Sequence, residues 1–504
     1  MRRLKVYLPL LVLFCALQTA FAQDLASFEK RVQIRTLPNG LTVLLLIRPE
    51  APVFSFFTIV DAGDAQDPAG KTGLAHMMEH MAFKGTNNIG TTNITAETEA
   101  LAKVEAAYAE YDRENNRTVN RDEKKIAEMK AVWDKAREEA DEYVVKNEFG
   151  EIVERNGGVG LNASTGDDST QYFYSLPANR LELWAYLESE RFMHPVMREF
   201  YKERDVVMEE RRMRTDSSPT GRLVEQFLSV AYDGSPYHRP SIGYVSDLKH
   251  FSATDAANFF KTHYVPSNMV VALVGDLDAE KTFALVEKYF GRIPSGPKPE
   301  EYTTEQTKQS SERTVLLHDP SQPFYVEGYQ KPNYRDKDDV VYSVISSVMS
   351  EGRTSRLYRA LVRDKKIAIA AAGFSGFPGD KYRNLYAFYA VPSQGHNATE
   401  MGDAIHEAID KLKADGVSAD ELKMVKTRSK ASLLRSLANN QGLAINLAEN
   451  QLKYGDWREL FRRIDKIDAV TNEDVKRVAN EVFVDTNRTV GILETKGAAK
   501  GAQR

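Results

Sequence analysis

The stretch AHMMEHMAFKGT constrains this chain more than any other part of its sequence. It carries His76, Glu79 and His80 in the spacing H-x-x-E-H, and its pattern predicts a helix over residues 74–84. Residues four apart on a helix lie on one face, about one turn apart. Both imidazoles can therefore reach a single ion, with the carboxylate of Glu79 beside them.

Two imidazoles and a carboxylate that leave one position open are the ligand set that zinc prefers in catalytic sites. One Zn²⁺ held this way lowers the pKa of a bound water towards about 7 and polarises a carbonyl oxygen. Glu79 is placed to act on that water as a general base. The only cysteine is Cys15, which excludes a thiolate zinc site. The alternative is an ordinary amphipathic helix with His and Glu on its surface.

The third ligand must come from another segment, and a helix predicted over residues 200–214 offers Glu203, Glu209 and Glu210. Glu203 and Glu210 are two turns apart and share a face, whereas Glu209 points about 100° away. One of the pair could bind the metal while the other hydrogen-bonds a ligating histidine. By periodicity alone, an ordinary charged helix face is the favoured interpretation of the same residues.

The first 22 residues have the pattern of a secretory signal. Arg2, Arg3 and Lys5 precede an apolar run at 6–16 that is too short to span a bilayer comfortably, and AFA at 20–22 is typical of a cleavage site. We expect export, most simply to a bacterial periplasm. The alternative is an uncleaved segment that anchors the chain in the inner membrane.

Apolar runs and turn residues divide the rest of the chain into short elements. They predict strands at 41–47, 53–60, within 157–176 and at 269–275, and one further helix at 181–192. Thr72 is a candidate N-cap and Gly85 a stop signal for the helix at 74–84. Residues 97–154, rich in Ala, Glu, Lys and Arg, predict a solvated helical hairpin that turns near Asn115-Asn116.

The chain reads as two related halves joined by a linker. Residues 263–276 (HYVPSNMVVALVGD) resemble residues 482–495 (VFVDTNRTVGILET), each with an aromatic residue, a turn ending in Asn, and a buried-looking strand. We expect two α+β domains at 23–295 and 313–496, a proline-rich linker at 296–312 and a disordered tail at 497–504. The 67 basic and 72 acidic residues argue against a nucleic-acid binder.

In these features the sequence resembles the pitrilysin/insulinase family of zinc peptidases, the inverzincins, and most of all its short bacterial processing-peptidase-like members. The resemblance runs from about 33 to 494, outside the charged insertion, through LPNGLTVLLL, the AHMMEHMAFKGT block, GGVGLNASTGDDSTQYFYSLP and ERDVVMEE. It implies two homologous domains, each an antiparallel-rich sheet packed with helices. It also implies that His76, His80 and Glu210 bind zinc, that Glu203 supports a ligand, and that Glu79 is the base.

The family binds an extended peptide by adding it to a sheet edge. The segment that does so matches residues 158–165, which puts Asn162 and Ala163 at the positions that touch the peptide backbone. Without the resemblance, this segment is only a glycine-rich turn that enters a strand.

One departure from the family concerns the second half. Active members carry an Arg followed seven residues later by a Tyr; the Arg matches Arg363, but the Tyr position falls on Ala370, or on Ile369 with one residue missing. Related zinc-bearing subunits obtain this pair from a homologous zinc-free partner, so we expect such a partner here. The alternative is that His238 or a nearby Tyr replaces the missing hydroxyl.

The sequence therefore predicts an exported zinc metalloendopeptidase that hydrolyses peptides or unfolded polypeptides in an enclosed chamber, as the zinc-bearing subunit of a heterodimer. Two alternatives stay open. One is a zinc hydrolase acting on another amide, and the other is a non-catalytic, structural or chaperone-like subunit of the same fold.

Overall fold

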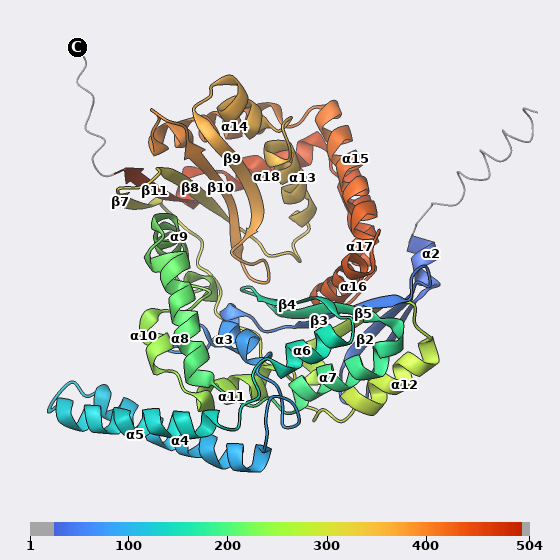
Figure 1. The fold of residues 1–504 in the computed structure, drawn as a ribbon. Coiled ribbons are helices and arrows are strands. Elements are labelled where there is room, and N and C mark those ends of the chain that lie inside the picture. Colours follow the sequence, from blue (N-terminus) through green and yellow to red (C-terminus); the bar gives the residue numbers. More distant parts are fainter. Residues whose placement is uncertain (1–24, 496–504) are drawn as a thin grey trace, which may run out of the picture.

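The computed structural model describes residues 25–495 (Figure 1). The predicted signal at 1–22, with Cys15, and the predicted tail at 497–504 lie outside these residues. Within residues 25–495, no helix combines the length and apolar character needed to cross a membrane.

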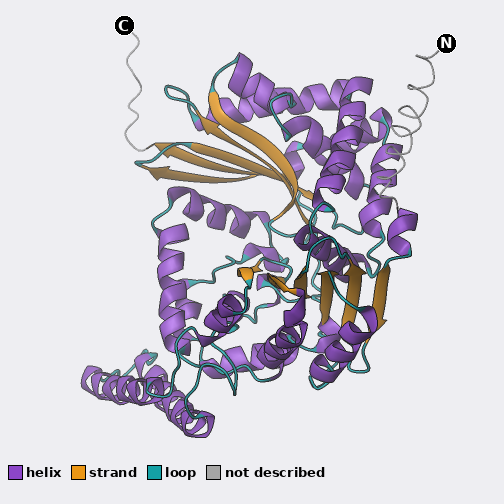
Figure 2. Cartoon of the chain, turned by 45° about the vertical axis from the view of Figure 1, so that its right-hand side comes forward, coloured by secondary structure: helices purple, strands orange, loops and turns teal. Residues whose placement is uncertain are grey.

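Two mixed sheets organise the chain (Figure 2). The first has the order β1-β2-β6-β3-β5-β4 and the second the order β7-β11-β8-β10-β9. The strands of the first are β1 Val32–Thr36, β2 Thr42–Ile47, β3 Val53–Val60, β4 Val159–Thr165, β5 Thr170–Pro177 and β6 Met269–Gly275. Those of the second are β7 Arg313–Asp319, β8 Phe324–Lys331, β9 Ala368–Phe377, β10 Asn384–Pro392 and β11 Arg488–Thr495.

The two sheets repeat one plan, and two asparagines mark the repeat. β6 is parallel to β2 and antiparallel to β3, just as β11 is parallel to β7 and antiparallel to β8. Asn268 donates through Nδ2 to the carbonyl oxygens of Asp61 and His263. Asn487 donates to the corresponding oxygens of Gln330 and Val482. The predicted α+β fold with two related sheets is confirmed; the domain boundaries at 295 and 313 remain a prediction.

Helices pack on both sheets. Those of the first half are α2 Leu25–Glu29, α3 Leu74–Met81, α4 Ile94–Asn115, α5 Glu123–Asp141, α6 Glu148–Arg155, α7 Leu181–Met193, α8 Phe200–Arg211, α9 Pro219–Ala231, α10 Val245–His250, α11 Ala253–His263 and α12 Ala279–Phe290. Those of the second half are α13 Asp339–Ser350, α14 Ala398–Asp415, α15 Ala419–Ser436, α16 Asn440–Tyr454, α17 Glu459–Ala469 and α18 Asn472–Val482.

Each half lends one helix to the sheet of the other half. α16 lies against β3 and β6, where Leu443 and Leu447 join the buried apolar cluster that contains Phe57 (Figure 1). Conversely, α9 lies against β7 and β11. There the ring of Phe227 packs over two glycines, Gly328 and Gly491. A Cβ atom added at these glycines would lie only 3.0 or 3.2 Å from the ring. Two of the buried apolar clusters therefore draw residues from both halves of the chain.

The predicted linker has no helix or strand, but glutamines fasten it to the body. The Oε1 atom of Gln306 accepts hydrogen bonds from three successive backbone amides, at residues 233–235. Gln309 donates to the carbonyl oxygen of Arg488.

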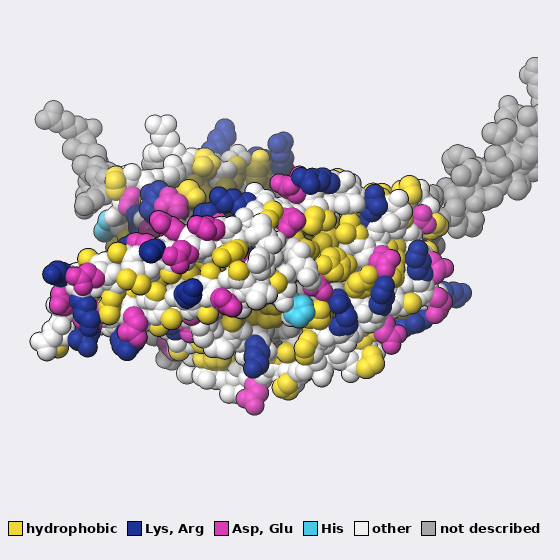
Figure 3. Space-filling model, turned by 60° about the horizontal axis from the view of Figure 1, so that its bottom comes forward, with side chains coloured by type: hydrophobic (Ala, Val, Ile, Leu, Met, Phe, Trp, Pro, Cys, Tyr) yellow, Lys and Arg dark blue, Asp and Glu magenta, His cyan; other side chains and the backbone are white. Residues whose placement is uncertain are grey.

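The charged insertion is the expected helical hairpin, with α4 ending at Asn115, and it projects from the body (Figure 1). Seen from below, its lysines and arginines mix with aspartates and glutamates, without a field of one sign (Figure 3). It is less solvated than its composition suggests, because Trp133 is buried against Tyr108 of α4 and Tyr201 of α8. The insertion thus packs directly on the helix that carries Glu203 and Glu210.

Candidate metal centre

The helix with the H-x-x-E-H pattern begins at Leu74 as expected, but its N-cap is Gly73, one residue after the expected Thr72. Thr72 is not the cap: its amide and hydroxyl both donate to Asp247, and Gly73, with φ at +93°, precedes the first turn. The carboxylate of Asp67 accepts from the amides of Gly73 and Ala75, at 2.6 and 2.9 Å. An acidic side chain at this end also favours the helix dipole. Because the capping carboxylate lies six residues before Gly73 and not at the N-cap position itself, the capping pattern did not reveal it.

Three side chains converge where α3 meets α8. The Oε2 atom of Glu210 lies 3.6 Å from Nε2 of His76 and 3.6 Å from Nε2 of His80. A tetrahedral zinc ion with bonds of about 2.1 Å separates its ligand atoms by about 3.4 Å. Among residues 25–495, His76, His80 and Glu210 are the one group of three such side chains whose donor atoms lie within 4.8 Å of one another. The donor set fits zinc in both chemistry and spacing.

The electrostatics of the two imidazoles differ. Burial and the neighbouring His80 lower the pKa of His76 to about 4, so His76 is neutral near pH 7 with a free lone pair. A ligating imidazole must be neutral. Burial also lowers the pKa of His80, but a hydrogen bond and the charge of Glu203 more than reverse this effect and raise it.

Glu203 lies behind His80. Its Oε2 atom is 3.4 Å from Nδ1 of His80, and its Oε1 atom is 2.5 Å from Nζ of Lys84. Burial alone would raise the pKa of Glu203. Hydrogen bonds from His80 and Lys84 outweigh this effect and lower the pKa to about 2. This ionised carboxylate orients the imidazole, as partners of metal ligands commonly do. Lys84 also pairs with Glu199 at 3.0 Å.

Periodicity left three glutamates on α8 as candidates, and the structure separates them. Glu210 faces the histidines, and its Oε1 atom pairs with Arg214 at 3.0 Å. Glu209 is turned to solvent, where it pairs with Arg212. The helix predicted to run to residue 214 ends at Arg211 and continues as a π-helical turn, Arg212–Asp216, which carries Arg214.

Glu79 lies between the metal ligands and the edge of the first sheet. Its carboxylate hydrogen-bonds Thr165 at the end of β4, and burial raises its pKa. β4 is an edge strand of this sheet and contains Asn162 and Ala163. The amide of Ala163 donates to the Oδ1 atom of its own neighbour Asn162, at 2.9 Å. The predicted base and the predicted peptide-binding strand therefore lie side by side.

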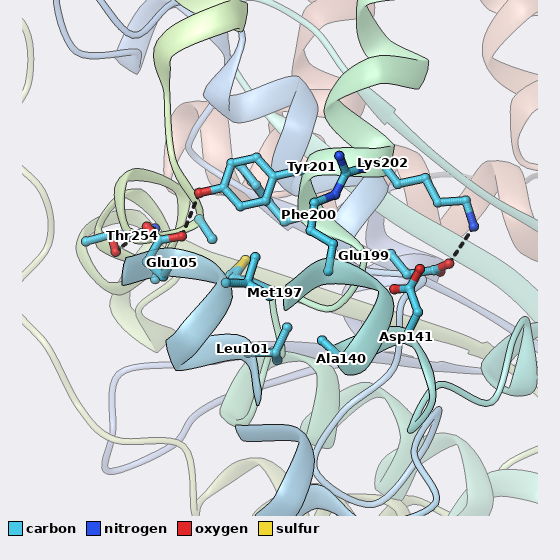
Figure 4. A pocket seen from close by; sticks show the side chains of 14 residues that line it. Leu101, Glu105, Ala140, Asp141, Met197, Glu199, Phe200, Tyr201, Lys202 and Thr254 are labelled. Atoms are coloured by element: carbon cyan, nitrogen blue, oxygen red, sulfur yellow. Dashed lines mark hydrogen bonds and ion pairs between the residues drawn. The ribbon is translucent and has the colours of Figure 1, made fainter. Parts of the chain in front are cut away.

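A cavity of about 370 Å³ adjoins Glu79 and His80. Two phenylalanines and the segment that leaves the insertion form its walls; the lining includes Phe83, Lys84, Val144, Val145, Lys146, Asn147, Glu148 and Phe149. Glu199 lines this cavity and also a second one of about 220 Å³, which lies between the insertion and α8 (Figure 4). The second cavity contains none of the three metal-ligand candidates.

In the second half, the residues that match the family's Arg and Tyr positions face solvent or contact their own neighbours in the chain. Arg363 lies on the π-helical turn Tyr358–Asp364 and pairs with its neighbour Asp364. Ile369 and Ala370 lie on β9, with Ile369 63% exposed and Ala370 opposite Val391 of β10. His238 bonds the carbonyl oxygen of Ser235 through Nδ1. No hydrogen bond or ion pair found within residues 25–495 joins these side chains to His76 or Glu210.

Two residues of the centre were missed from the sequence. Lys84 lies one helical turn beyond His80, and Arg214 lies one turn beyond Glu210. The i,i+4 spacing from each candidate ligand was the signal that could have indicated both.

Comparisons with known proteins match both halves of the chain. The family model described as Insulinase (Peptidase family M16) matches residues 42–132, and the model described as Peptidase M16 inactive domain matches residues 250–429. The zinc protease PqqE of Helicobacter pylori is 29% identical over 467 residues, which cover 91% of this chain and 92% of that protein. The uncharacterized zinc protease YmxG of Bacillus subtilis is 22% identical, with coverage of 89% and 95%.

Solved structures share the fold. The crystal structure of a protease from Helicobacter pylori has a TM-score of 0.77 and 27% identity, and the match covers 92% of this chain and 99% of that one. A peptidase M16 inactive domain from Pseudomonas fluorescens, at 15% identity, covers 94% of this chain with a TM-score of 0.73 and shows the fold alone. With both halves matched by models of one family and the same two-domain fold in its relatives, this chain belongs to the insulinase family of peptidases, M16.

Proposed function

We propose that this chain is a zinc metalloendopeptidase that hydrolyses peptides or unfolded polypeptides. The observation that carries the proposal is the convergence of His76, His80 and Glu210 on one point, with Glu79 beside them and next to a sheet edge. Packing alone requires none of these four polar side chains at this position.

Each residue has a defined task in the proposed reaction. His76, His80 and Glu210 would hold the zinc ion, and Glu203 would keep the ring of His80 in place through Nδ1. The ion would supply Lewis-acid polarisation of the scissile carbonyl and of the attacking water. Glu79 would accept a proton from the attacking water and return it to the leaving amine. Burial raises the pKa of Glu79 towards the working pH, which suits a group that must both take and give a proton.

The substrate proposed for this site is an extended backbone. A peptide added antiparallel to β4 would pass Asn162, Ala163 and Thr165 and bring a carbonyl to Glu79. The Asn162 side chain that now bonds the Ala163 amide would have to give way to a substrate carbonyl. Folded proteins rarely offer a free strand, so unfolded chains are the preferred substrates.

The proposal includes a homologous, zinc-free partner. In support of it, Arg363 pairs only with Asp364 at the surface, and the Tyr position holds an apolar side chain. A probable mitochondrial-processing peptidase subunit beta from Arabidopsis thaliana is 24% identical to this chain, and its name describes a subunit. We propose the periplasm as the place of action on the signal-like pattern of the first 22 residues.

A structural role without catalysis is the second candidate. The family model that matches residues 250–429 describes an inactive domain, and the second half departs from the Arg and Tyr pattern. The matched domain is the half without the metal ligands, so it does not remove the reason for proposing catalysis in the first half.

Elemental analysis and peptide cleavage together test the proposal. Glu79→Gln should keep about one zinc per chain but lose cleavage of unstructured peptides, and His80→Ala should lose both. Glu209→Gln, on the solvent side of α8, is the matched control and should change neither. Equal zinc in wild type and His80→Ala would remove the metal assignment. Bound zinc without cleavage, with and without a candidate zinc-free subunit, would favour the structural role.

A further inference from the structure

The π-helical turn that follows α8 brings an arginine to the metal-ligand candidates. Nη2 of Arg214 lies 3.0 Å from Oε1 of Glu210, while Oε2 of the same carboxylate faces His76 and His80. This is the one ion pair that Arg214 makes within residues 25–495, and its side chain is 70% exposed. Because a guanidinium group carries several N–H donors in a planar fork, most of them stay free for a ligand.

The other two arginines of this stretch lack that freedom. Arg211 is buried and pairs with Glu225 at 2.9 Å. Arg212 is turned to solvent, where its guanidinium group pairs with Glu209. Arg214 differs from both, because it combines an exposed guanidinium group with a place beside the candidate ligands. π-helical turns are frequent at functional sites.

The opposite flank of the centre carries the opposite charge. The cavity of about 370 Å³ beside Glu79 and His80 is lined by four glutamates and two lysines, and its lining includes neither Glu210 nor Arg214. The cavity and the arginine therefore flank the candidate ligands from different sides. A substrate carboxylate would be repelled on the cavity side and attracted on the side of Arg214.

Strand β4 gives a bound peptide its direction. Glu79 contacts Thr165 at the end of β4, whereas α6, whose first turn lines the cavity, packs beside Leu161 near the start of the strand. A peptide that runs antiparallel to β4 passes Thr165 first and Leu161 later. Its residues after the scissile bond therefore approach the cavity, and the residues before that bond lie on the side of Arg214.

We infer that Arg214 selects peptides with an aspartate or glutamate shortly before the scissile bond. The inference rests on the proposed peptidase function and names the class of substrate for that site. A carboxylate matches the planar fork of a guanidinium group and accepts two parallel N–H bonds from it. A neutral amide side chain cannot form the same charged contact. Arg214 thus acts on specificity, and no proton passes through it.

Peptide binding tests the selection without cleavage. Zinc-loaded Glu79→Gln is titrated into labelled, unstructured peptides and followed by fluorescence anisotropy. A peptide with one Glu before the scissile bond should bind about 10-fold more tightly than the same peptide with Gln. Adding Arg214→Gln should abolish this difference. Arg212→Gln is the matched control on the solvent side of the turn and should preserve it. Equal binding of the two peptides to Glu79→Gln would overturn the inference.

Charge reversal separates selection from support of Glu210. Cleavage sites in a peptide mixture are mapped by mass spectrometry for the wild type and for Arg214→Glu. The wild type should favour acidic residues before the cleaved bond, and Arg214→Glu should favour lysine or arginine there. If Arg214 only supports Glu210, the variant will slow cleavage of all peptides alike, which rejects the inference and leaves the proposed function standing. A wild type that neither binds zinc nor cleaves, with or without a candidate zinc-free subunit, would overturn both.

Discussion

Lys84 joins the metal centre to two carboxylates, those of Glu203 and Glu199, at 2.5 and 3.0 Å. It thereby holds the carboxylate that in turn holds His80. Removing such outer partners of a ligand commonly weakens metal binding by about 10–100-fold. In the proposed site, Lys84 would position a ligand without touching the metal or the substrate.

We therefore expect Lys84→Met to lower zinc affinity by about 10-fold or more, measured by competition with a chromophoric chelator. Lys202→Met is the control, because Lys202 pairs with Glu199 and not with Glu203. Its zinc affinity should match the wild type. An unchanged affinity in Lys84→Met would mean that Glu203 keeps its position without the lysine.

Arg198 is a second residue that supports the segment after α3. It is buried, and all its donor nitrogens are used: Nε and Nη2 bond the carboxylate of Glu97, and Nη1 and Nη2 bond the carbonyl oxygens of Lys84, Thr86 and Ile89. The arginine thus ties the loop after α3 to the first turn of the insertion.

The glycines of that loop make room for the guanidinium group. A Cβ added at Gly85 or Gly90 would lie 2.9 or 2.7 Å from Nη1 of Arg198, and both glycines have positive φ. Gly85 was expected only as a stop signal for the helix. Its second reason, contact with a residue more than 100 positions away, is invisible in a local pattern.

Arg198→Lys should destabilise the protein by about 3–5 kcal/mol, because lysine cannot satisfy Glu97 and three carbonyl oxygens and leaves buried groups unpaired. Denaturant titration followed by circular dichroism measures the loss. Arg155→Lys, an exposed change beside Glu151, should cost less than about 1 kcal/mol. A similar small loss for both variants would refute the role assigned to the buried group.

At the scale of elements, α14 and β8 enclose a buried charge in the second half. Glu327 of β8 accepts hydrogen bonds from Tyr325 and Tyr329 and contacts Nε2 of His406 at 2.6 Å. Burial lowers the pKa of His406, but the hydrogen bond and charge of Glu327 outweigh it and raise the pKa above the ordinary value. A raised pKa means that the folded state binds the proton more tightly than the unfolded chain.

This contact should make stability depend on pH. The stabilisation is complete below about pH 6.5, the value of an unfolded histidine, and is lost as pH rises through the higher folded value. His406→Gln should therefore cost more free energy of unfolding at about pH 5.5 than at about pH 9. Denaturant titrations at both pH values measure it. His194→Gln is the control; an equal cost at both pH values for His406→Gln would contradict the linkage.

Patterns within one element were enough to predict several elements of the first half. The strands expected at 53–60 and 269–275 have those bounds, because both are apolar, β-branched runs closed by turn residues. The helix expected at 74–84 runs over Leu74–Met81, and Glu210, which the resemblance implies as a ligand, lies 3.6 Å from both of its histidines. Three features were not predicted: Asp67, six residues before Gly73, as the cap of α3, the π-helical turn after α8, and the exchange of α9 and α16 between sheets. An apolar helix face does not say which sheet it will cover.

For the whole molecule, the exchanged helices couple the halves. Leu447 on α16 is fully buried within the apolar cluster of the first sheet, although it lies in the second half of the chain. Leu447→Ala should destabilise the protein by about 2–5 kcal/mol and shift one cooperative transition that includes both sheets. Scanning calorimetry and tryptophan fluorescence should report the same midpoint. Leu434→Ala, an exposed change on α15, should have little effect; two separated transitions would mean that the halves unfold independently.

The same exchange sets the order in which the protein can be completed as it is synthesised. The first sheet is made of residues 32–275, but the helix that covers one of its faces comes from Asn440–Tyr454, near the end of the chain. In a growing chain, this apolar face of the first sheet therefore stays uncovered until almost the whole polypeptide has been made. A nascent chain in this condition is a natural client for holding chaperones.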